Sequence, residues 1–206
     1  GLCQLLRHDL PARFGADLDT LVNAAESLID QIKFQKDLTR AERRELIVEI
    51  GLIDTLDVLR DVMEFYRRLP LARDKTIETA PGSRSIALRT DRSLLLRCLG
   101  NLLKNALEAS RPGDCVVVGC RALRPEGTSE TWARFSVHSA AALSEAVRMQ
   151  IFKRAFTTKG DGRGLGAYSV KLFVENYLGG RVWFESTAER GTTFFIDIPC
   201  LSELPT

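Results

Sequence analysis

The hydrophobic period changes once along the chain, and this change restricts the fold more than any other feature. Residues 1 to about 70 carry apolar residues at alternating steps of four and three, a pattern typical of helices packed along a seam. From residue 73 onward, short strand-like runs alternate with helix-like runs. The sequence therefore predicts an α+β protein, in which a helical hairpin precedes an α/β sandwich. The seam of the first helix consists of Phe14, Leu18, Leu21, Ala25, Leu28 and Ile32.

A second helix is expected from Thr39, because Thr39 and Glu42 have the spacing of a capping box. Its seam would consist of Leu52, Leu56, Leu59, Met63 and Tyr66, before a turn at residues 69–71. A single pair of helices leaves such a seam partly uncovered. We therefore expect a homodimer through residues 1–70 that forms a four-helix bundle; the alternative is packing against the chain's own second domain.

The second region, residues 73–200, is expected to form one sheet with helices on one face. Strands adjacent in sequence predict antiparallel pairing, and Gly179 suits the position that ends the last helix. The expected strands are 85–88, 115–120, 132–137, 181–185 and 192–198, and the expected helices are 91–109, 144–152 and 167–178.

Composition excludes several classes of protein. The net charge of +2, from 29 basic and 27 acidic residues, argues against a dedicated nucleic-acid binder. Five cysteines without a CxxC pair predict free thiols in a reducing, cytoplasmic compartment. No apolar run approaches about 18 residues, so we expect neither a signal peptide nor membrane contact by this fragment. The helical character of its first residues predicts that the chain begins inside a longer protein.

Residues 157–166 form a glycine-dense stretch directly before a predicted helix. Glycine allows close approach of the backbone to an anion, and a helix N-terminus attracts phosphate. Lys159 and Arg163 add positive charge to the stretch. It is interpreted as a phosphate-binding loop, with a plain flexible loop as the alternative, and its spacing fits neither the Rossmann fingerprint nor the P-loop.

Two further sets of residues could carry chemistry. Asn101 and Asn105 lie four residues apart on one predicted helix, where their amide oxygens suit Mg²⁺; two solvated asparagines are the alternative. His8 could accept a phosphoryl group, with Asp9 as a base or orienting partner. A single exposed histidine without any role remains possible at this point.

The order of these motifs resembles the cytoplasmic core of sensor histidine kinases, over almost the whole chain. Residues 1–70 resemble the dimerisation and histidine-phosphotransfer domain, and 73–200 resemble the ATP-binding domain shared with gyrase, Hsp90 and MutL. The resemblance rests on Asn101 and Asn105 (N box), Phe152 and Phe156 (F box), Gly162, Gly164 and Gly166 (glycine box), and the pair Gly191-Thr192.

The resemblance implies ATP and Mg²⁺ as cofactors, His8 as phosphoacceptor and Asn105 as metal ligand. It also implies that residues 159–166 cover the triphosphate. Hydrolysing members of the superfamily carry a glutamate where this chain has Asn101, and an amide cannot act as a general base. The residues implied to contact nucleotide are Asn101, Lys104, Asn105, Ser139, Ala141, Thr158, Lys159, Gly162, Arg163, Gly164, Leu165, Gly166 and Thr192.

One family motif is altered in this chain. Ser139 stands where the family has an adenine-binding aspartate, and Ala141 stands at the first glycine of the same box. Loss of a charge-assisted contact lowers affinity by about 1.5–3 kcal/mol. The expected function is a kinase that autophosphorylates His8 and passes the phosphoryl group to the receiver domain of a response regulator. The alternative is a degenerate kinase that serves as a dimeric scaffold with impaired nucleotide binding.

Overall fold

The computed structural model describes residues 32, 34–124, 130–154 and 166–200. Contacts between Cα atoms divide the chain into two units, Gly1–Leu46 and Ile47–Thr206. Within the first unit, residues 34–42 are helical, and the Glu45 N–H donates to the Arg40 carbonyl at 2.8 Å. The predicted seam of the first helix up to Leu28, together with His8 and Asp9, lies outside the described residues.

The second unit is built on a five-stranded sheet in the order β2-β4-β5-β7-β6. Strand β2 runs parallel to β4, and all other neighbours are antiparallel. The pairs β4–β5 and β6–β7 confirm the antiparallel pairing expected for strands adjacent in sequence. The strands are β2 (Thr76–Thr79), β4 (Cys115–Leu123), β5 (Trp132–Ser139), β6 (Arg181–Thr187) and β7 (Gly191–Pro199).

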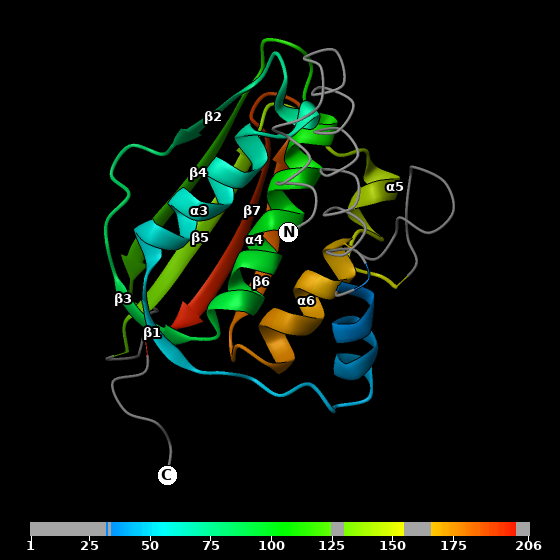
Figure 1. Cartoon of the computed structure of the whole chain (residues 1–206). Helices are drawn as coiled ribbons and strands as arrows, with labels where there is room; N and C mark the ends of the chain where they lie inside the picture. The colour runs from blue at the N-terminus through cyan, green and yellow to red at the C-terminus, as the bar shows by residue number, and fades with distance from the viewer. Residues whose placement is uncertain (1–31, 33, 125–129, 155–165, 201–206) are drawn as a thin grey trace, which may run out of the picture. The chain divides into compact units, whose positions relative to one another are not determined.

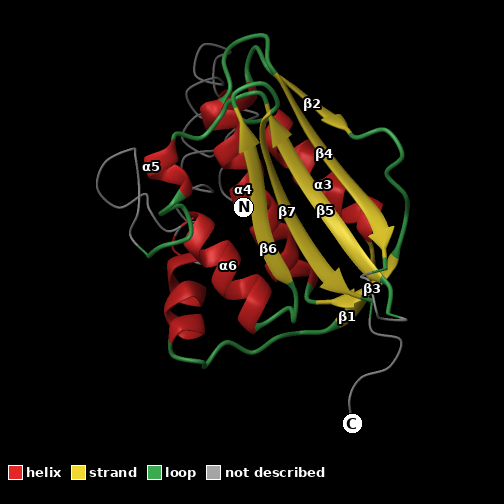
Figure 2. Cartoon of the chain, turned by 180° about the vertical axis from the view of Figure 1, so that it is seen from behind, coloured by secondary structure: helices red, strands yellow, loops and turns green. Residues whose placement is uncertain are grey.

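Helices α3 (Thr55–Arg67), α4 (Arg92–Ala109) and α6 (Gly166–Asn176) lie on one face of this sheet, as Figure 1 shows from the helix side. The view from behind presents the sheet with no described helix in front of it (Figure 2). The expectation of helices on one face of the sheet is confirmed, whereas the expectation of a single sheet is wrong, because β1 (Gly51–Asp54) and β3 (Ala87–Thr90) form a second, two-stranded sheet. Gly179 follows α6 with φ +64, which confirms its role at the helix end.

The core lies between the sheet and the helices. Nine residues of α4 are buried, and they include Leu95, Leu99, Leu102 and Leu103. Phe135 of β5 and Phe173 of α6 are the largest fully buried side chains. Because α4 packs against α3, α6, β4 and β5, its apolar face joins all parts of this core.

The predicted second helix from Thr39 to Tyr66 is wrong. Thr39 lies inside a helix rather than at its start, and its hydroxyl donates to the Gln35 carbonyl at 2.9 Å. Residues 45–50 are not helical, and Gly51–Asp54 form strand β1, which pairs antiparallel with β3 (Ala87–Thr90). The later half of the predicted helix exists as α3, and it belongs to the sheet unit rather than to an N-terminal hairpin.

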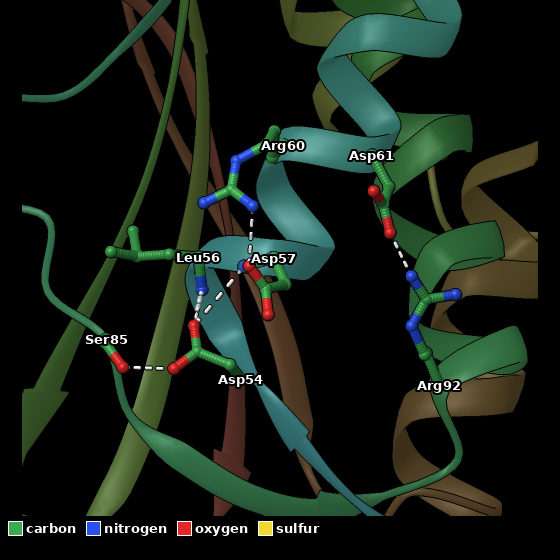
Figure 3. Close-up of polar contacts among 7 residues, drawn as sticks. All are labelled: Asp54, Leu56, Asp57, Arg60, Asp61, Ser85 and Arg92. Carbon is green, nitrogen blue, oxygen red and sulfur yellow. Dashed lines mark hydrogen bonds and ion pairs between the residues drawn. The ribbon is translucent and has the colours of Figure 1, made fainter.

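Asp54 is the N-cap of α3, and its hydrogen bonds explain why the helix begins at Thr55. The Asp54 carboxylate accepts hydrogen bonds from the backbone N–H groups of Leu56 (2.7 Å) and Asp57 (3.3 Å), as Figure 3 shows. The Ser85 hydroxyl donates to the other carboxylate oxygen and, with these N–H groups, holds the pKa of Asp54 below its usual value. Nearby, Asp61 and Arg92 form an ion pair between α3 and α4 (Figure 3).

Two shorter elements also differ from expectation. The predicted strand 85–88 is observed as β3 (Ala87–Thr90), which pairs with β1 in a separate two-stranded sheet. The predicted helix 144–152 is limited to α5 (Glu145–Arg148), a single turn without a buried residue. An apolar face that buries nothing gives a longer helix no tertiary support.

Four of the five cysteines are described, and all four are free thiols. Cys98 and Cys120 are buried, and burial raises the pKa of both thiols, which makes them poor nucleophiles. In the described ranges, no helix has the length and apolar character needed to cross a bilayer.

Gly180 provides a test of the packing between α6 and β7. A Cβ atom at this position would come within 2.3 Å of the Asp197 carbonyl oxygen and 3.1 Å of Val174 Cγ1. We expect Gly180→Ala to lower the free energy of unfolding by about 1–3 kcal/mol, measured by urea denaturation. Gly51→Ala is the matched control, because its Cβ would meet nothing within 4 Å. Equal stability of the two variants would contradict this packing.

Candidate functional site

The two asparagines of the predicted N box lie on α4, the helix at the centre of the core. Asp91 caps this helix by accepting from the Leu94 N–H at 2.9 Å, and its second oxygen accepts from the Glu49 N–H at 2.8 Å. Asn101 and Asn105 are half-buried on a face next to the buried leucines, whereas Lys104 is exposed. Their position is therefore determined by the packing of α4 rather than by a flexible segment.

Both asparagines lie next to the first turn of α6. The Asn101 side-chain N–H donates to the Ser169 hydroxyl at 3.3 Å, and that hydroxyl donates to the Gly166 carbonyl at 2.7 Å. A Cβ at Gly166 would lie 3.7 and 3.8 Å from the amide nitrogen and oxygen of Asn105. The structure thus brings the N box together with the last glycine of the glycine-dense stretch.

The other residues predicted in that stretch, Thr158, Lys159, Gly162, Arg163, Gly164 and Leu165, lie outside the described residues, as does Phe156. Phe152 is described and half-buried. Its ring lies 5.9 Å from that of Phe184 and 6.3 Å from that of Phe194, between ring centroids. Phe152 therefore anchors the segment after α5 to strands β6 and β7.

A continuous chain of hydrogen bonds holds the segment that follows β5. The Leu143 N–H donates to the Ser186 hydroxyl (2.9 Å), which lies 2.8 Å from the Thr192 hydroxyl. The Thr192 hydroxyl in turn donates to the Ala141 carbonyl at 2.7 Å. Because each hydroxyl carries one hydrogen, the Ser186 hydroxyl is the donor to Thr192, and neither has a second hydrogen to offer. We call these four residues the hydroxyl chain.

Ser139 is buried beside the hydroxyl chain. It pairs with Thr192 across β5 and β7 and is 5% exposed. Gly191 is required here, because a Cβ at Gly191 would come within 2.2 Å of the Ser139 carbonyl oxygen, and its φ is +72. The backbone after β5 therefore packs tightly on the start of β7.

The amide oxygen of Asn105 is a suitable ligand for a hard cation that keeps most of its water. In the part of the chain that the structure describes, no three His, Cys, Asp or Glu side chains gather as a metal site. A neutral amide oxygen such as that of Asn105 can supply one ligand to Mg²⁺, which takes others from water and phosphate. The surroundings of Asn105 therefore fit a Mg²⁺-bound phosphate.

Sequence reasoning did not identify Ser169, Ser186 or the Ala141 carbonyl. Ser169 is fully buried and lies three residues after Gly166. A serine among the apolar residues of α6 was the available signal, because a buried hydroxyl needs a partner. Ser186 had no comparable signal, since its partners lie 43 and 6 residues away in sequence.

The comparisons with known proteins agree with this geometry. The family model described as Histidine kinase-, DNA gyrase B-, and HSP90-like ATPase matches residues 90–202, more than half of the chain. The chain is 29% identical over 191 residues to the sensor histidine kinase CusS of Escherichia coli O157:H7, covering 88% of this chain and 38% of CusS. It is 30% identical to the sensor histidine kinase AruS of Pseudomonas aeruginosa, covering 96% of this chain and 20% of AruS.

Solved structures of histidine kinases share the fold. Full-length ShkA in complex with AMPPNP has a TM-score of 0.71 at 22% identity, over 100% of this chain and 43% of ShkA. The catalytic domain of ThkA has a TM-score of 0.62 at 22% identity, over 74% of this chain and 96% of that domain.

The matched region includes α4, β4, β5, α6, β6 and β7, and so contains every described residue of the candidate site. The chain spans less than two fifths of the length of CusS. The sequence motifs, the sheet with helices on one face and the family match agree, and the chain belongs to the histidine kinase-, DNA gyrase B- and HSP90-like ATPase family.

Proposed function

We propose that the chain is the cytoplasmic kinase core of a two-component sensor, which phosphorylates His8 from Mg-ATP. The observation that carries the proposal is the arrangement of Asn101, Asn105 and Gly166. Neutral amides and the start of a helix meet there, and the amide of Asn101 cannot act as a general base that activates water. This arrangement favours transfer to a side chain over hydrolysis.

Each residue has a proposed part in the transfer. Bound ATP with Mg²⁺ supplies the γ-phosphoryl group. Asn105 holds the metal through its amide oxygen, and Ser169 keeps Asn101 and the start of α6 in place. The neutral His8 imidazole would attack the γ-phosphorus, the bond from that phosphorus to the β,γ-bridging oxygen would break so that ADP leaves, and Asp9 would accept or orient the imidazole proton. Backbone N–H groups of the glycine-dense stretch, with Lys159 and Arg163, neutralise the phosphate charge.

The proposed partners follow from the similarity of the chain to histidine kinases. The phosphoryl group of His8 passes to an aspartate on a response-regulator receiver domain. A solved structure of ThkA in complex with the response regulator TrrA, TM-score 0.62 at 17% identity, supports this class of partner. The homodimer is proposed through the part of residues 1–70 that precedes α3, because α3 belongs to the sheet unit.

The hydroxyl chain supports a second candidate function, a kinase-derived scaffold with impaired nucleotide binding. In this alternative, the segment from Ser139 to Leu143 is held by Thr192 and Ser186 rather than by a nucleotide. The helical unit would still dimerise and dock a partner. Nucleotide binding separates the two candidates.

The first prediction concerns the phosphoacceptor. Incubation of the full chain with Mg²⁺ and γ-labelled ATP is expected to give an acid-labile, base-stable label, which His8→Ala removes. His138→Ala is the matched control, since His138 is the second histidine and its Nδ1 already lies 3.0 Å from the Thr193 hydroxyl. Absence of label together with absence of nucleotide binding by calorimetry would leave only the scaffold.

The second prediction concerns the metal ligand. Asn105→Ala is expected to weaken Mg-ATP binding about tenfold or more, because the cation loses its amide ligand. Asn176→Ala, an exposed asparagine at the end of α6, should leave the affinity unchanged. Calorimetry in Mg²⁺ and in EDTA measures both. An unchanged Mg²⁺ dependence in Asn105→Ala would contradict the metal role.

The third prediction concerns the altered box. Ser139→Asp is expected to raise ATP affinity about tenfold, because a carboxylate restores a charge-assisted acceptor for the adenine amino group. Ser136→Asp, three residues earlier on the outward face of β5, is the matched control and should leave ATP affinity unchanged. If both variants bind ATP equally, Ser139 does not face the base.

A further inference from the structure

The face of the sheet opposite the helices has an unusual composition. An uncovered sheet face normally carries small polar and charged side chains. Here the outward positions form cross-strand rows that include both tryptophans of the chain, Trp132 and Trp183. One row reads Gly119, Ser136, Phe195 and Trp183, and the next reads Arg121, Arg134, Asp197 and Arg181. We call these two rows with Trp132 the arginine–tryptophan face; Figure 2 shows the backbone of the sheet from this side.

Two arginines on this face are held rigidly. Arg134 binds the fully buried Asp197 carboxylate through two hydrogen bonds of 2.8 and 2.9 Å, and Arg181 binds it at 3.0 and 2.9 Å. Both guanidinium groups lie over the Trp183 ring, at 4.6 and 5.2 Å from its centroid. Their side chains are thus ordered before any partner arrives, which reduces the entropy lost on binding.

The second row, which contains the three arginines, has a net positive charge. Asp197 is its one carboxylate and compensates one of three arginines. Arg121 is exposed and makes no ion pair with any described residue. Glu185, on the same face, lies on β6, three strands away from Arg121 on β4. Asp197 is shared by Arg134 and Arg181, so that group keeps one positive charge, and Arg121 adds a second beside Arg134.

A hollow of about 260 Å³ lies beside these two arginines. The loop from Ala80 to Ser83 forms one wall and rests on Gly119, where a Cβ would come within 2.6 Å of Ala80 Cβ. The described lining combines Arg121 and Arg134 with hydroxyl groups and the Phe195 ring, and contains no carboxylate. Sites that enclose small ligands have volumes of roughly 300–1,000 Å³, so this open hollow better suits one side chain of a partner.

We propose that the arginine–tryptophan face docks an acidic segment of a partner protein, whose carboxylate meets Arg121 and Arg134 while a neighbouring apolar side chain enters the hollow. Arginine and tryptophan are the residue types most enriched where interfaces concentrate their binding energy. The surface lies on the face of the sheet opposite α4 and α6. It therefore goes beyond the proposed kinase function and does not depend on nucleotide.

The test selects random short peptides displayed on phage against the immobilised full chain, with counter-selection against Arg121→Glu. The selected peptides are expected to contain Asp or Glu beside an apolar residue. Their affinity, measured by fluorescence anisotropy, should fall about tenfold or more in Arg121→Glu, because one charge-assisted pair becomes repulsive. Added salt should weaken it as well.

Three further variants make the result specific. Ser136→Tyr fills the hollow without changing charge and should also abolish binding. Arg68→Glu, an exposed arginine at the end of α3, and Asn105→Ala, on the opposite side of the sheet, should leave it unchanged. Circular dichroism checks that each variant is folded. Selected peptides without acidic residues, no selection above background, or equal affinity for the native chain and Arg121→Glu would overturn the proposal.

Discussion

The burial of the apolar face of α4 holds the described sheet unit together. This helix packs against α3 and α6 on its sides and against β4 and β5 below, so its leucines are shared by all layers of the core. The same helix carries Asn101 and Asn105. A displacement of either asparagine would require the core to repack, which close-packed interiors resist. The proposed metal ligand thus takes its precision from hydrophobic packing rather than from polar contacts.

Elements with strong local signals could be predicted from the sequence. The periodic helix around Asn101, the alternating strands of β5 and β7 and the glycine after α6 each depend on residues close in the chain. The Thr39 and Glu42 pair shows the limit of such signals, because its capping-box spacing also occurs inside a helix. The actual start at Asp54 depends on Ser85, 31 residues later, and on β3 as partner of β1. Such distant pairings leave no periodic pattern in either segment.

The candidate site was predictable to a similar degree. The asparagines and the last glycine were recognised by type and spacing, and the structure brings them together. Ser169 and Ser186 were not, because single serines acquire meaning only from the groups that surround them after folding. The structure also shows what holds the segment after Ser139, which contains Ala141, in place. Hydrogen bonds between Ala141 and Thr192 and between Leu143 and Ser186 fix the conformation of this segment without a bound ligand.

Because α3 belongs to the sheet unit, the connection between the two units is short. The Glu45 N–H is bonded to Arg40 in the helical segment, and the Glu49 N–H is bonded to Asp91 at the start of α4. Only three residues, 46–48, lie between these two anchored positions, and the four steps from residue 45 to residue 49 span at most about 14 Å when fully extended. A tether this short keeps the local concentration of one unit near the other high and limits the orientations they can sample. Relative motion of the two units is therefore confined to rotations about the backbone bonds of this short tether.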